Sequence, residues 1–123
     1  MVIRDVQKSR HMANTLYQKA QFNFENGSYT FAINVYDKLI NNYPESNYIP
    51  FALQSRAIAA SNLKSFANSE RDYKMILEQY PSHEIANSAL LGLQEALQRT
   101  GHSDQFSDYL TMYRNANPES DKL

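Results

Sequence analysis

A recurrence at intervals of 37 residues constrains the fold of this chain more than any other feature of its sequence. Pro44, Pro81 and Pro118 lie 37 residues apart, and tyrosines precede the first two of them. Other positions fall in the same register, among them Leu16, Leu53 and Leu90; Tyr36, Tyr73 and Leu110; Leu39, Ile76 and Tyr113. Such a fixed period is typical of architectures that stack one supersecondary unit repeatedly. A chain of 123 residues has room for three copies.

Each copy contains two apolar runs at helical spacing, separated by a short polar break. In the first copy, Leu16, Ala20 and Phe24 lie on one helical face and precede Asn26-Gly27-Ser28. Gly27 is suited to the left-handed conformation that closes a helix, and Ser28 to capping the next one. The spacing predicts six helices, at about 13–26, 29–42, 50–63, 66–79, 84–100 and 103–116. We expect the first helix to begin near residue 4, because the apolar stripe continues through Val6 and Ala13.

The composition excludes several classes of function. The 12 Lys and Arg residues are balanced by 13 Asp and Glu residues, so the chain lacks the basic surface that binding of nucleic acid needs. No stretch approaches the ~18 apolar residues of a membrane span, so no membrane insertion is expected. The absence of cysteine excludes disulfides, thiolate metal sites and a catalytic thiol.

Residue types used in catalysis are present but are not arranged for it. His102-Ser103-Asp104 contains the residue types of a catalytic triad, yet consecutive residues cannot face one another as a triad requires. A turn with Ser103 as a helix cap explains this segment better. No glycine-rich phosphate loop, calcium loop or H-E-x-x-H motif occurs. We therefore expect no enzyme, no catalytic residue, no metal site and no cofactor.

Several of the recurring residues point to a known family. Ala20 and Ala57 are small residues at one register position, and the turn and second run of the first copy carry Gly27, Tyr29, Ala32, Tyr36 and Pro44. These positions resemble the tetratricopeptide repeat (TPR), a helix–turn–helix unit of about 34 residues. The additional residues of each unit lie around Tyr43-Pro44. The sequence of this segment is similar to the repeats of bacterial outer-membrane assembly lipoproteins, of periplasmic cell-division coordinators and of large multi-repeat Bacteroidetes proteins. Arg56 departs from the family pattern, since its position is usually apolar.

The resemblance implies an all-α fold. We expect one domain over residues 1–123, built of three tandem TPR-like repeats that form a short right-handed superhelix. Residues 1–12 would form an N-terminal extension, and the repeats would span about 13–49, 50–86 and 87–123.

The resemblance also implies where a partner would bind, because the first helix of each stacked pair lines a concave groove. In this chain the implied groove, which we call the first-helix face, consists of nine residues: Tyr17, Gln21, Phe24, Gln54, Ile58, Ser61, Leu91, Glu95 and Gln98. The implied function is a non-enzymatic scaffold that binds a protein or peptide partner. Two alternatives stay open: these residues pack within the array, or the repeats are purely structural spacers of a longer solenoid protein.

Two further expectations concern context. The third repeat carries more apolar side chains than contact with the second should need, so we expect either a fragment of a longer array or self-association through the C-terminal repeat. The family resemblance implies a soluble protein that is periplasmic or associated with the cell envelope, and a cytoplasmic one otherwise.

Overall fold

Helices form all the regular structure in the part of the chain that the structure describes. The structure, a computed structural model, covers residues 2–119 and describes side chains from residue 6 onward. Its elements are α1 (Val2–Glu25), α2 (Tyr29–Asn42), α3 (Ile49–Asn62), α4 (Phe66–Gln79), α5 (Ala86–Thr100), the short 3-10 helix η1 (Ser103–Gln105) and α6 (Phe106–Ala116). The prediction of an all-helical chain is confirmed over these residues. The first helix begins even earlier than residue 4.

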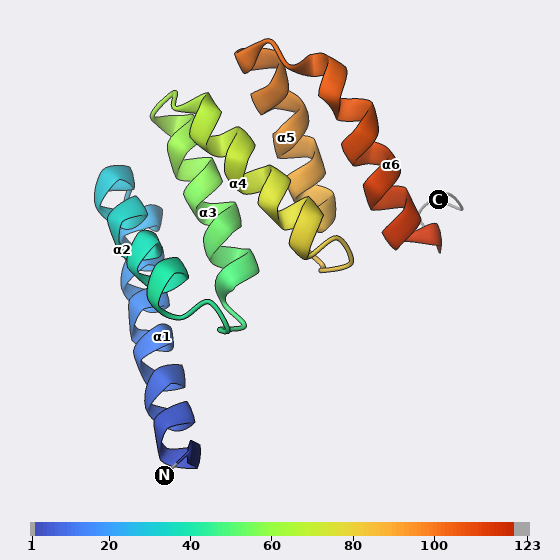
Figure 1. Cartoon of the computed structure of the whole chain (residues 1–123). Helices are drawn as coiled ribbons and strands as arrows, with labels where there is room; N and C mark the ends of the chain where they lie inside the picture. The colour runs from blue at the N-terminus through green and yellow to red at the C-terminus, as the bar shows by residue number, and fades with distance from the viewer. Residues whose placement is uncertain (1, 120–123) are drawn as a thin grey trace.

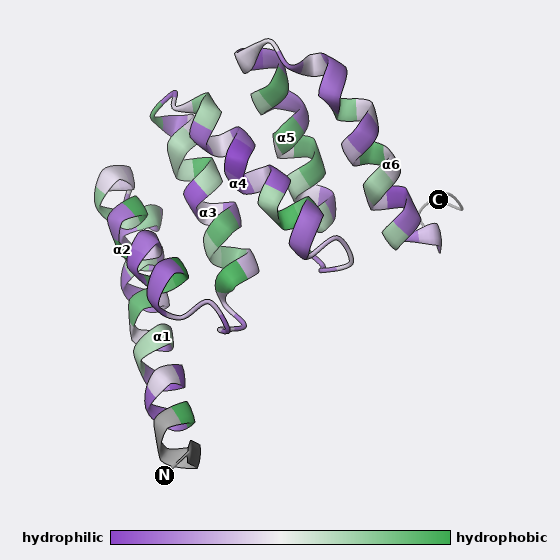
Figure 2. Cartoon of the chain, viewed as in Figure 1, coloured by the Kyte–Doolittle hydropathy of each residue, from purple (hydrophilic) through white to green (hydrophobic). Residues whose placement is uncertain are grey.

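The helices stand side by side in a row in the order of the sequence (Figure 1). α2 packs against both α1 and α3, and α4 packs against both α3 and α5. α2 and α4 therefore each bridge the helix before and the helix after them in the sequence. α6 packs against α5 and α4 at the far end of the row. Hydrophobic and hydrophilic segments alternate along α2, α4, α5 and α6, as expected for amphipathic helices that bury one side (Figure 2), whereas α3 buries residues on most of its sides.

Residues with positive φ close three of the helices. Gly27 and Gly101, with φ of 80° and 82°, follow α1 and α5, as the sequence pattern predicts for Gly27. Lys64 makes the corresponding turn after α3 with a φ of 61°. Ser28 stands at the N-cap of α2, although its side chain makes no capping hydrogen bond.

The expected helix cap at Ser103 is wrong. Ser103 begins the 3-10 turn η1, in which the Gln105 N–H donates to the His102 carbonyl, and α6 begins only at Phe106 with Gln105 at its N-cap. The chain tightens before α6 starts, because a 3-10 turn satisfies the free backbone groups of this segment.

Small residues let the helices approach closely in the core. Ala20 and Ala57 are fully buried, as are Leu53 and Tyr36. Between α4 and α5 the close approach is made by Gly92, where an added Cβ would overlap the ring of Tyr73. Position 94, which is in register with Ala20 and Ala57, carries an exposed glutamine.

None of the described helices combines the length and the apolar character that crossing a bilayer requires.

Candidate functional site

On α1, the residues of the first-helix face are engaged within the protein. The ring of Tyr17 stacks on that of Tyr48, with centroids 4.5 Å apart and 14° between the planes. Gln21 Oε1 accepts a 2.6 Å hydrogen bond from the Tyr36 hydroxyl. Phe24 meets Tyr29 edge-on at 5.8 Å between centroids. These three side chains are half-buried, and each helps to hold α1 against its neighbours.

On α3, the three residues of this face are also half-buried. The Ser61 hydroxyl lies 2.7 Å from the Ser69 hydroxyl, which itself donates to the Ala57 carbonyl. Gln54 differs, since its Oε1 atom is buried and has no hydrogen-bond partner among the described residues. An unsatisfied buried acceptor is unfavourable, so the Gln54 amide stands out on this face.

On α5, the same face is open. Leu91 has 62% of its surface exposed, and Glu95 and Gln98 are exposed as well. The nine residues that the sequence places together therefore fall into an engaged set on α1, an intermediate set on α3 and an open set on α5.

A hollow of about 980 Å³ lies at the N-terminal end of this face. One wall is α1, and the other is the loop between α2 and α3 together with the start of α3. Asn14 and Phe51 line the hollow and precede Tyr17 and Gln54 by three residues, so they lie on the same helical faces. The Tyr48 hydroxyl closes one end by donating to Asn14 Oδ1 at 2.8 Å. The lining includes Val6, Ser9, Arg10, Ala13, Asn14, Tyr43, Pro44, Glu45, Asn47, Tyr48 and Phe51.

None of the nine residues lines this hollow, because its lining depends on the N-terminal part of α1, which extends beyond the α2–α3 loop. The continuation of the apolar stripe through Val6 and Ala13 is the signal that could have located it.

An ion cluster joins α2, α3 and α4. Arg56 donates to both carboxylate oxygens of Asp72 and to Asp37, all at 2.8 Å, and Asp72 is fully buried. Burial alone would lower the pKa of Arg56, but the hydrogen bonds to Asp72 and Asp37 outweigh it and raise that pKa. The guanidinium is thus committed to holding three helices together. These contacts account for a charged side chain inside the helical packing.

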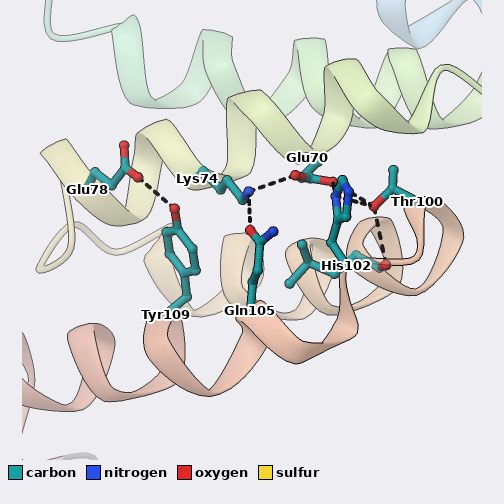
Figure 3. A network of polar contacts seen from close by, with 8 residues as sticks. Glu70, Lys74, Glu78, Thr100, His102, Gln105 and Tyr109 are labelled. Atoms are coloured by element: carbon teal, nitrogen blue, oxygen red, sulfur yellow. Dashed lines mark hydrogen bonds and ion pairs between the residues drawn. The ribbon is translucent and has the colours of Figure 1, made fainter.

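A second polar cluster, which sequence analysis did not anticipate, surrounds Glu70 at the α4–α5–α6 junction (Figure 3). Glu70 is 8% exposed and accepts hydrogen bonds from Lys74 Nζ at 2.7 Å and Thr100 Oγ1 at 2.6 Å, and its Oε1 lies 2.9 Å from His102 Nδ1. Lys74 also donates to Gln105. Two of these partners are 30 and 32 residues from Glu70, outside the 37-residue register, so no periodic signal marks them.

The Glu70 cluster is arranged for structure rather than for acid–base chemistry. Burial would raise the pKa of Glu70, but the hydrogen bonds of Lys74, Thr100 and His102 outweigh it and lower the pKa to about 2. A carboxylate with that pKa stays ionised near neutral pH and has no proton to give. A similar bridge from Tyr109 to Glu78, 2.7 Å long, ties α6 to α4 farther along (Figure 3).

Within the described residues, no three His, Cys, Asp or Glu side chains gather as a metal site would require. No protein-family model matches the chain, and a search of curated proteins found no similar sequence.

Proposed function

We propose that this protein is a non-enzymatic protein-interaction module of the TPR type. In this proposal three helical hairpins of 37-residue period form a short right-handed superhelix, and a partner segment binds along the first-helix face. The observation that carries the proposal is the 980 Å³ hollow, because it extends this face by one helical turn and has the size of a binding cleft.

The environment of equivalent residues supports the repeat arrangement. Ala20 and Ala57, at one register position, are both fully buried, and Tyr36 and Tyr73, at another, are 0% and 5% exposed. α2 bridges α1 and α3 in the same way as α4 bridges α3 and α5. Nearest-neighbour packing of this kind is expected of stacked helical repeats.

The lining of the hollow suits an extended peptide segment. Tyr43, Tyr48 and Phe51 offer apolar surface, and Asn14 and Asn47 offer amides that can pair with a peptide backbone. The engaged residues Tyr17, Gln21 and Phe24 maintain the shape of the face in this proposal, and the hollow and the open residues of α5 make the contacts.

The experiment is a selection of short random peptides displayed against the immobilised protein. A Ser9→Trp variant fills the hollow from an exposed position on its wall, and Gln18→Trp places the same side chain at an exposed position of α1 outside the hollow. Enriched peptides should bind wild type and Gln18→Trp alike and should lose about tenfold or more in affinity for Ser9→Trp. Failure to enrich any peptide, or equal binding by the two variants, would contradict the proposal.

The alternative, structural spacer repeats within a longer solenoid protein, is favoured by one observation. Phe22 on α1 is 67% exposed, whereas Ala59, 37 residues later, is fully buried against neighbouring helices. In a longer array a preceding helix would cover position 22. Under this alternative the peptide selection returns nothing, and Phe22→Ser leaves the stability of the isolated chain within about 0.5 kcal/mol.

Self-association through the C-terminal repeat stays a prediction. Leu110 and Tyr113 are half-buried against the core, and Met112 is 38% exposed on the same helix. If α6 mediates a dimer, light scattering at high micromolar concentration gives a mass above 14.2 kDa, and Met112→Lys lowers it. A strictly monomeric chain under these conditions would contradict it.

A further inference from the structure

The exposed side of α5 combines an apolar side chain with unpaired acids. Glu84, just before α5, and Ser88, Leu91, Glu95 and Gln98 on it are spaced four, three, four and three residues apart, so they form one stripe, and all five are exposed. Leu91, at 62%, is among the most exposed large hydrophobic residues of the described chain. In the described residues, no hydrogen bond or ion pair engages Glu84 or Glu95.

Within the described residues, no cation forms an ion pair with these carboxylates. The only charged residue of α3 is Arg56, which is committed to Asp37 and Asp72. At the end of α5, the guanidinium of Arg99 lies over the ring of Phe66, 5.2 Å from its centroid. Arg10 lies in the hollow, on the wall formed by α1. The α3–α5 part of the first-helix face is therefore acidic as well as partly apolar.

The charge of Glu95 also acts on Tyr73, which is buried on α4. Burial raises the pKa of Tyr73 to about 12, and the nearby charge of Glu95 adds to that shift. Glu95 thus lies close to the contact between α4 and α5, where Tyr73 packs on Gly92. A cation that binds on this side of α5 therefore meets the Glu95 carboxylate, which forms no ion pair within the described residues.

We infer that the partner segment carries a lysine or arginine beside an apolar side chain, and that this pair docks on Glu95 and Leu91 where the segment crosses α5. The inference rests on the proposed function, since it assigns the chemistry of the segment bound there. Opposite charges across a binding surface set specificity and orientation, and an exposed apolar side chain beside them supplies the anchor. A second basic residue of the segment can form an ion pair with Glu84 if the segment continues toward the start of α5.

The test compares peptide selections on three proteins: wild type, Glu95→Lys and Asp108→Lys. Asp108 is exposed on α6, away from the stripe, so its reversal changes the net charge equally and serves as the matched control. Peptides enriched on wild type should carry Lys or Arg beside an apolar residue. Their affinity should fall about tenfold for Glu95→Lys, fall less for Glu95→Gln, and stay unchanged for Asp108→Lys. Selection on Glu95→Lys should instead enrich Asp or Glu at the same place.

The outcomes separate this inference from the proposed function. Enriched peptides without a basic preference, or with affinity indifferent to Glu95→Lys, overturn the inference and leave the interaction module standing. A selection that enriches nothing overturns both. A dimer of wild type that Glu95→Lys dissociates in light scattering would assign the face to a second copy of the chain, and would overturn the inference too.

Discussion

The two ends of the first-helix face differ in what their side chains do. Tyr17 on α1 and Leu91 on α5 hold the same place in the 37-residue register, yet Tyr17 is stacked on Tyr48 and Leu91 is 62% exposed. The register fixes which way a side chain points. The segment packed against that side chain decides whether it stabilises the fold or stays exposed. At the α1 end this segment is the α2–α3 loop, which supplies Tyr48.

A comparison of two leucines gives the largest expected effect. Leu53 is fully buried on α3, so Leu53→Ala should lower the free energy of unfolding by about 2–5 kcal/mol. Leu91→Ala removes an exposed side chain and should change it by less than about 0.5 kcal/mol. Urea denaturation of both variants measures the difference. If Leu91→Ala lowered the free energy of unfolding more than Leu53→Ala, the conclusion that Leu91 is exposed on α5 would be wrong.

The Glu70 cluster holds the α5 end of the molecule together, and its contribution should depend on pH. Because folding lowers the pKa of Glu70 to about 2, its stabilisation is present above the ordinary carboxyl pKa and is lost as the pH falls toward 2. Glu70→Gln should therefore be less stable than wild type by up to about 3 kcal/mol near pH 6, with a deficit that shrinks below about pH 4.5. Denaturation curves across this range test the claim. The exposed Glu45→Gln is the control, and a deficit that did not change with pH would contradict it.

The aromatic stack at the α1 end should give the smallest of these effects. Tyr17→Ala removes a half-buried ring and should cost about 2 kcal/mol. A double-mutant cycle with Tyr48→Ala isolates the ring–ring contact, for which we expect a coupling energy of about 1 kcal/mol. A coupling near zero would mean that the two rings act independently, and the distinction between the two ends would weaken.

Helical periodicity and turn residues were sufficient to locate the elements, because they report local preferences. Leu16, Ala20 and Phe24, whose spacing predicts a helix, lie on α1. Gly27 has the positive φ expected of it. The same reasoning failed at Ser103, where a helix cap and a 3-10 turn use similar residues.

The candidate site was less accessible to sequence reasoning, because it depends on contacts between distant segments. Periodicity grouped Tyr17, Gln54 and Leu91 but carried no information on Tyr48, which comes from the following loop and covers only the first of them. The partners of Arg56 come from α2 and α4, and Thr100 and His102 reach Glu70 from the end of α5 and the turn after it, at separations unrelated to the repeat. Sequence patterns therefore indicated which side chains share the face but not which of them other segments of the chain cover.

Binding along the first-helix face is tested most directly by a map of the bound surface by NMR. Amide resonances of the labelled protein would be followed while a peptide enriched on wild type is added. We predict shifts in α1 and the α2–α3 loop around the hollow and along α5 near Leu91 and Glu95, with α6 and the exposed side of α2 unaffected. Shifts confined to α2, α4 or α6 would contradict it, because the partner would then bind outside the first-helix face.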